Sequence, residues 1–199
     1  MGNSTMIDIV GSLLIGGMLL VLTMKMDENS VRTTYETQEN LTVQQNLTSL
    51  IQNVEFDFRR IGYRRNGGAP PANQCILYGR GDSIAFLADL GDSGTMNTVR
   101  WYLGGKIPGS SNPNLRMLYR QVDAAPPTGA NLGVADFQLD YLDAFGVPVD
   151  TPYIAGAPGP PNLIRLTIKV EPTAAYDTAF ATNFAVWRET RLVSRNLIR

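Results

Sequence analysis

The feature that most constrains this chain is a nearly continuous apolar run from Met6 to Met24, in which Asp8 is the only charged residue. Lys25 ends the run, and an amphipathic pattern then continues to Tyr63. We predict one helix of about 55 residues, roughly 80 Å long at the rise of an α-helix. The rest of the chain is too short to enclose such a helix. Its apolar first third must therefore find its surroundings outside the chain: a bilayer, copies of itself, or both in turn.

The second part of this helix, residues 27–63, is amphipathic. Its apolar side chains recur every three or four residues, at Val43, Leu47, Leu50, Ile51, Val54, Phe58 and Ile61. Polar residues occupy the opposite face. This pattern predicts that the second part of the helix lies along a sheet. Residues 31–42 have fewer apolar anchors, and we expect them to be exposed or packed against neighbouring subunits.

After Gly62 and the glycine and proline cluster at 66–71, the sequence consists of short strand-like runs separated by turns. The predicted strands cover residues 75–78, 83–88, 97–103, 115–122, 134–141, 163–170 and 182–197. Residues 79–82 carry a hairpin-turn signal. We predict an α+β fold, in which one antiparallel sheet is packed on the amphipathic part of the long N-terminal helix. The predicted segments are a possible leader remnant at 1–5, the apolar segment 6–26, the amphipathic segment 27–63, and the sheet domain 64–199.

Composition excludes several functions. The net charge of the 199-residue chain is −1, so there is no basic surplus to bind nucleic acid through its phosphates. The chain has no histidine and one cysteine, Cys75, which excludes Cys/His zinc sites, histidine-based catalysis and an intrachain disulfide. We expect Cys75 to be buried, with an intermolecular bond as the alternative. The sequence therefore predicts no enzyme, no cofactor, no small-molecule substrate and no nucleic-acid partner.

Three carboxylates around Gly146 are the candidate metal ligands, at Asp140, Asp143 and Asp150. Carboxylate oxygens are the ligands that Ca²⁺ prefers in loops. Their spacing matches no EF-hand. We therefore predict no bound metal, and these three residues are the candidates if Ca²⁺ does bind.

The apolar run has two features that bear on function. The uncharged stretch from Ile9 to Met24 is short for a membrane span of about 20 residues, unless Asp8 lies near the interface or finds a partner. Asp8 is thus either a marker of the membrane surface or a pairing residue. Gly11, Gly16 and Gly17 each weaken a helix in water by about 1 kcal/mol relative to alanine. Between packed apolar helices, such small residues allow close approach.

A series of motifs follows one order along the chain. Within the predicted helix they are the acidic and glycine-bearing DIVGSLLIG from Asp8, then Tyr35 with Gln38-Glu39, then FDFRRIGY from Phe56. The strand motifs are VADFQLDY at 134–141, IRLTI at 164–168 and RLVSRNL at 191–197. In this order and spacing the chain resembles the type IV pilins and pseudopilins. It is most similar to PilW-type minor pilins and the related J-type pseudopilins of type II secretion.

This resemblance implies a structural subunit of a pilus-like or pseudopilus filament, built by helical assembly. The N-terminal segment would rest in the inner membrane and then join the filament core, with the protein ending in an extracellular filament or at the cell surface. Its partners would be copies of itself or other pilins, in a role in secretion or adhesion. The assembly surface would comprise Asp8, Gly11, Leu13, Leu14, Gly16, Gly17, Leu19 and Leu20. Asp8 would pair with the free amino terminus of an adjacent subunit.

The sequence departs from the family pattern at its start. The family's acidic residue is usually glutamate, whereas Asp8 stands here. The family's leader is basic and ends in glycine, whereas Gly2, Asn3 and Ser4 are the candidate processing residues here. Whether the subunit is a major, tip or priming component stays open. The alternative function is a membrane-anchored monomer that carries an extracytoplasmic binding domain.

Overall fold

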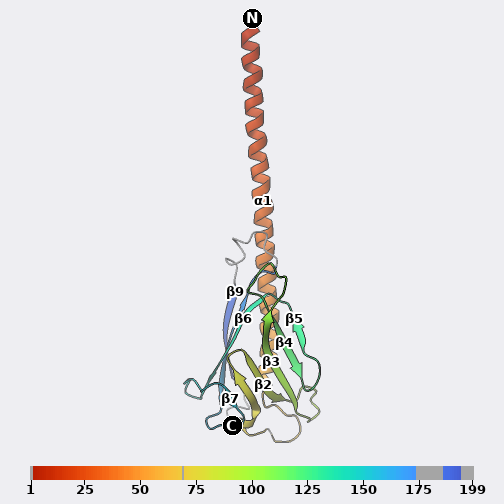
Figure 1. The fold of residues 1–199 in the computed structure, drawn as a ribbon, viewed down its shortest axis with the longest axis vertical. Helices are drawn as coiled ribbons and strands as arrows, with labels where there is room; N and C mark the ends of the chain where they lie inside the picture. Colours follow the sequence, from red (N-terminus) through yellow and green to blue (C-terminus); the bar gives the residue numbers. More distant parts are fainter. Residues whose placement is uncertain (1, 69, 174–185, 194–199) are drawn as a thin grey trace. The chain divides into compact units, whose positions relative to one another are not determined.

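The computed structural model describes residues 2–68, 70–173 and 186–193. The chain divides into two compact units, Met1–Leu41 and Thr42–Arg199. The first unit consists of the N-terminal part of helix α1, which as a whole spans Gly2–Arg59. The second unit contains the C-terminal part of α1, a short helix and the strands (Figure 1). The predicted α+β class is confirmed.

Helix α1 ends at Arg59, four residues before the predicted end. The last turn tightens, since the amides of Arg60 and Ile61 bond to carbonyls three residues back, at 3.0 and 3.2 Å. Gly62 then adopts a φ of 70°, which glycine tolerates without strain. Its amide donates to the Leu87 carbonyl at 2.7 Å, so the chain leaves the helix to join the sheet.

Nine strands and a short helix follow α1 among the described residues. They are α2 (Ala72–Cys75), β1 (Ile76–Arg80), β2 (Ser83–Ala88), β3 (Asn97–Lys106), β4 (Arg116–Val122), β5 (Thr128–Ala130), β6 (Val134–Leu142), β7 (Tyr153–Ile154), β8 (Leu163–Val170) and β9 (Val186–Val193). The predicted ranges for β2 and β8 match in full, and those for β1, β3, β4, β6 and β9 overlap the observed strands. Helix α2, β5 and β7 were not predicted. The ends of the predicted last strand, 182–185 and 194–197, lie outside the described residues.

The strands form two antiparallel sheets, whereas the sequence predicted one. Six strands follow the order β5-β4-β3-β2-β1-β7, and three follow the order β6-β8-β9. The sheets meet where the Leu139 amide of β6 donates to the Gly81 carbonyl at 2.7 Å. There the Tyr141 hydroxyl donates to the carbonyls of Arg80 and Ser83, at 3.1 and 3.2 Å. Alternation along a strand shows which face is buried but not which strand lies beside it, so the division was not predictable from the pattern.

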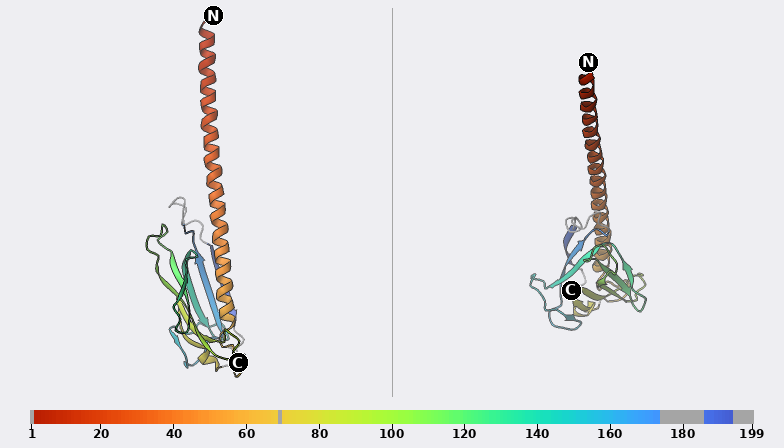
Figure 2. Two further views of the ribbon diagram at one scale, coloured as in Figure 1. Left: turned by 90° about the vertical axis from the view of Figure 1, so that its right-hand side faces the viewer. Right: turned by 45° about the horizontal axis from the view of Figure 1, so that its top comes forward.

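The core of the second unit lies between the C-terminal part of α1 and the two sheets. Figure 2 shows this part of the helix running along the strands. All seven apolar residues of the predicted stripe are buried, and Val54 is 0% exposed. The Phe58 ring packs edge to face with Phe86 of β2, with 5.7 Å between ring centres. In β8 the alternate residues from Ile164 to Val170 are buried, as predicted.

Candidate functional site

The first candidate site is the apolar surface of α1 in the first unit. Its large apolar side chains from Met6 to Met26 are each between 53% and 74% exposed. The helix is long and apolar enough to cross a membrane, judged by length and composition. Exposure of so many adjacent apolar side chains makes this stretch a candidate interaction surface, because soluble monomers rarely expose large apolar patches.

The predicted assembly residues all belong to this surface. Asp8 is exposed, and it shares one helix face with Ser12 and Gly16, spaced four residues apart. A Cβ atom added at Gly11, Gly16 or Gly17 would meet nothing within 4 Å in the described part of the chain. These glycines therefore serve no close packing against other described residues, although each lowers the helix propensity of the segment. The exposed Leu13, Leu14, Leu19 and Leu20 surround them.

Polar side chains in the apolar run bond to their own helix. The Ser12 hydroxyl donates to the Ile9 carbonyl, and the Thr23 hydroxyl donates to the Leu20 carbonyl, each at 2.9 Å. Neither hydroxyl hydrogen is thus left needing a water acceptor, which suits a helix surrounded by apolar groups. The candidate processing residues Gly2, Asn3 and Ser4 occupy the first turn of α1.

Two of the three candidate calcium ligands, Asp140 and Asp143, make separate local contacts. Asp140 forms an ion pair with Arg165 at 2.9 Å. One carboxylate oxygen of Asp143 accepts the amides of Phe145 and Val147, both at 2.8 Å. Asp150 is exposed. Throughout the described ranges, no three Asp, Glu, Cys or His side chains come together as a metal site.

A buried carboxylate that the sequence analysis did not assign, Asp57, joins α1 to the six-stranded sheet. Its carboxylate accepts a hydrogen bond from Trp101 Nε1 at 2.8 Å. It accepts two more from Arg120, from Nε at 2.6 Å and from Nη2 at 3.1 Å. Asp57 is 2% exposed. The signal was present, because Asp57 follows Val54 by three residues and so falls on the apolar stripe. An acid at such a position requires donors from the element packed against it.

A second buried carboxylate, Glu171, fixes the loop before β4 to the end of β8. Lys169 Nζ lies 2.8 Å from Glu171, and the side-chain amides of Asn112 and Asn114 donate to it at 2.9 and 3.1 Å. Burial alone would raise the pKa of Glu171, but the hydrogen bonds from Lys169, Asn112 and Asn114 lower the pKa below its usual value. The lowered pKa keeps the Glu171 carboxylate ionised, so its charge-assisted hydrogen bonds hold the loop in place.

Cys75 is buried, as expected from the sequence, and its thiol is free. Its exposed fraction is 0%, and its sulfur approaches the carbonyls of Pro70 and Pro71 at 3.6 and 3.5 Å. Burial raises the pKa of the Cys75 thiol, which disfavours the reactive thiolate. An intermolecular bond through Cys75 would therefore require the core to open.

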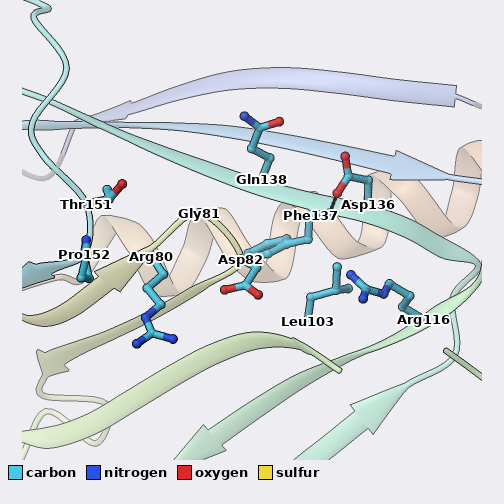
Figure 3. A pocket seen from close by; sticks show the side chains of 10 residues that line it. All are labelled: Arg80, Gly81, Asp82, Leu103, Arg116, Asp136, Phe137, Gln138, Thr151 and Pro152. Carbon is cyan, nitrogen blue, oxygen red and sulfur yellow. Dashed lines mark hydrogen bonds between the residues drawn. The ribbon is translucent and has the colours of Figure 1, made fainter. Parts of the chain in front are cut away.

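Two of the clefts that are lined by described residues lie on the second unit. The first, which we call the hairpin cleft, has a volume of about 620 Å³ beside the β1–β2 turn. Figure 3 shows the Asp82 carboxylate between the side chains of Arg80 and Arg116, while Gln138 points away from it. The Asp82 carboxylate accepts the Ser83 hydroxyl at 3.0 Å. This open cleft offers charges of both signs to a polar partner.

The second, which we call the helix–sheet cleft, has a volume of about 440 Å³. It is lined by Leu50, Asn53, Phe56, Asp57, Trp101, Leu118, Arg120, Thr128 and Leu132. Its lining combines apolar side chains with the polar groups of Asn53, Asp57, Arg120 and Thr128. Phe56 is 57% exposed. A cleft of this kind suits an apolar group from a partner.

No protein-family model, curated protein or solved structure matches the chain. The class that the structure itself defines is an α+β protein with one long N-terminal apolar helix and antiparallel sheets, which is compatible with a pilin-like fold.

Proposed function

We propose that this protein is a pilin-like structural subunit, which rests in a membrane through the apolar part of α1 and assembles into a filament through the same surface. The observation that carries the proposal is the run of exposed apolar side chains from Met6 to Met26. A bilayer or a bundle of identical helices would bury this surface. The resemblance of the sequence motifs to pilins and pseudopilins favours the bundle.

The glycines support helix packing over simple anchoring. A membrane anchor needs apolar residues, but it has no use for Gly11, Gly16 and Gly17, which lower helix propensity and which no other described part of the chain approaches within 4 Å. In a bundle, these positions would allow neighbouring backbones to come close.

Asp8 is the residue that we propose sets the register between neighbouring subunits. A carboxylate on an otherwise apolar helix surface is costly in a dry environment unless a cation pairs with it. We propose that the cation is the amino terminus of an adjacent subunit. A buried pair of this kind specifies register more than it adds stability.

The test is the Asp8→Asn variant of the full chain, expressed in a bacterial membrane together with the proteins that assemble pili. We expect the assembled fraction in shear preparations to fall by about tenfold or more, the equivalent of about 1.4 kcal/mol. The near-ultraviolet circular dichroism of the sheet unit should not change. The matched control is Asp27→Asn, which removes an exposed acid outside the apolar run. Filaments of wild-type yield from Asp8→Asn would contradict the register role.

The alternative function, a membrane-anchored binding domain, gives a different result at the amino terminus. A trimmed and N-methylated terminus near Ser4 would support the filament subunit. A detergent-bound monomer that keeps Met1 would support the anchored domain, for which the charged hairpin cleft would then be the natural binding site.

A further inference from the structure

One turn of the second unit presents a large apolar side chain to solvent. Phe145, in the turn 143–147, is 91% exposed, and Val147 beside it is 56% exposed. We call this segment the Phe145 turn. No other large apolar residue among those described is as exposed, including those of the apolar helix surface. Exposing such a ring to water costs free energy, and contact with a partner would remove that cost.

The Phe145 turn is held in shape by its own hydrogen bonds. The Asp143 carboxylate accepts two amides of the turn at 2.8 Å each, and the Asp143 amide donates to the Val147 carbonyl at 2.9 Å. Gly146 supplies the positive φ, 80°, that closes the turn. Because the turn is already ordered, docking the ring would cost little conformational entropy.

The same molecule carries a receptor of matching chemistry, the helix–sheet cleft. Its most buried apolar lining residues are Leu50, Trp101 and Leu118, which are each at most 6% exposed. The volume of about 440 Å³ exceeds the space that one aromatic ring needs; a closed apolar cavity of about 150 Å³ already binds benzene. The exposed Phe56 ring at the cleft offers an aromatic partner.

The charges around the two surfaces are complementary. The connection from β6 to β7 contains Asp143 and Asp150 and no lysine or arginine. Beside the helix–sheet cleft, the Arg60 guanidinium lies 4.5 Å from the centre of the Phe56 ring and donates to the Leu90 carbonyl at 3.0 Å. Within the cleft, Asp57 and Arg120 neutralise each other as an ion pair. A carbonyl does not neutralise the Arg60 guanidinium, so Arg60 leaves positive charge beside the cleft. Opposite charges would favour and orient the contact.

The two surfaces belong to different edges of the six-stranded sheet. The cleft is lined by Thr128 of β5 at one edge, and the Phe145 turn leads into β7 at the other. Figure 1 shows β5 and β7 on opposite sides of the second unit. A contact between different patches on identical molecules is heterologous, and its repetition builds an open array unless the rotation closes a ring.

We infer that the Phe145 turn of one copy docks in the helix–sheet cleft of the next copy. The sheet units thereby add a head-to-tail contact to the assembly. This inference rests on the proposed function, because the apolar helix surface supplies most of the buried area. One aromatic side chain buries about 150–250 Å², far less than a stable interface requires.

The experiment is cysteine cross-linking of the full chain in membranes that assemble it. Two single variants, Ala144→Cys and Thr128→Cys, place thiols at exposed positions on the two surfaces and keep the Phe145 ring. Co-expressed and oxidised, they should give a disulfide-linked dimer that contains one of each, identified by distinguishable tags. The double variant should give a ladder of trimers and larger species. The parent chain, with Cys75 buried, is the control for background bonds.

A second pair of variants tests the ring itself. Phe145→Glu should lower the assembled fraction by about tenfold, the equivalent of about 1.4 kcal/mol per contact, whereas Phe145→Trp should keep it within about twofold. Thr95→Glu, which adds the same charge on another exposed loop, is the matched control.

The outcomes separate the inference from the proposed function. Assembly through the helix without the mixed cross-link would overturn the docking contact and leave the filament subunit standing. A mixed dimer without a ladder would overturn the open head-to-tail arrangement. A parent chain that stays monomeric in the membrane would overturn both.

Discussion

The two ends of helix α1 differ in where their apolar side chains go. From Val43 to Phe58 the apolar residues form a stripe on one side, and the sheets of the same chain bury that stripe. From Met6 to Met26 apolar residues occur on every side, and all the large ones are exposed. One continuous helix thus carries a surface that folds the protein and a surface that the protein alone does not cover.

The acidic residues on the two parts differ in the same way. Asp57 is buried and accepts three hydrogen bonds from Trp101 and Arg120 of its own chain. Asp8 is exposed on the apolar surface. An acid on an apolar helix face needs a hydrogen-bond donor or a cation as its partner. The chain itself supplies that partner at Asp57, and we propose that another subunit supplies it at Asp8.

The largest expected effect is a difference in unfolding free energy between substitutions in the buried stripe and on the exposed apolar surface of α1. Phe58→Ala removes a ring that is 1% exposed, and we expect it to lower the unfolding free energy of the sheet unit by about 3–5 kcal/mol. Leu14→Ala, at a 62% exposed position of the same helix, should leave that free energy unchanged. Urea unfolding of the full chain in mild detergent, followed by tryptophan fluorescence, measures both. Equal losses would show that the two surfaces are not independent.

A smaller effect is expected from the two acids. Asp57→Asn keeps the size of the side chain but leaves Arg120 without its counter-charge. Because the Arg120 side chain is 35% exposed, we expect a loss of about 1–3 kcal/mol in the same urea experiment rather than the full cost of a buried pair.

Asp8→Asn should not change the unfolding free energy of the sheet unit, although it should reduce assembly. A stability loss from Asp8→Asn as large as that from Asp57→Asn would mean that Asp8 has a partner within its own chain. The distinction between the two acids would then fail.

The smallest effect is a pH dependence confined to the sheet unit. The folded pKa of Glu171 is lowered, so the unfolded chain binds more protons than the folded chain between the two pKa values. The stabilisation is therefore present above the usual pKa of glutamate and is lost as the pH falls toward the lowered value. Glu171→Gln should flatten the fall in sheet-unit stability below about pH 5.

The measurement is thermal unfolding of the sheet signal at several acidic pH values in detergent. Glu55→Gln, which removes a carboxylate paired with Arg59 on the surface of α1, serves as the control. The apolar helix signal should persist through this range, because Asp8 is the only carboxylate between Met6 and Met26. An unchanged acid slope in Glu171→Gln would rule out this carboxylate as its source.

Much of the fold could be predicted from periodicity. A helix that buries one face repeats every three or four residues, and the stripe from Val43 to Ile61 identified the buried face without error. The strands with strong alternation, such as β8, were also predicted in full. The strands β5 and β7 were missed, because each has only two or three residues and lies in a stretch rich in glycine and proline.

Less of the candidate site could be predicted. The roles of Asp8, Gly11 and the other assembly residues stay predictions, because their partners are other molecules. The Phe145 turn and the helix–sheet cleft were not predicted. Their residues come from distant parts of the chain, and a lone phenylalanine in a loop has no signal that it will be exposed.

The sequence by itself determined that the chain has one long helix with an uncovered apolar third, since no other part is long enough to enclose it. It also determined which side of the second part faces a core. Only the tertiary structure decided that the strands divide into two sheets, that Asp57 meets Arg120, and that Phe145 and the helix–sheet cleft belong to different edges. The physical reason is that periodicity depends on neighbours in the chain, whereas pairing and clefts depend on contacts between residues far apart in it.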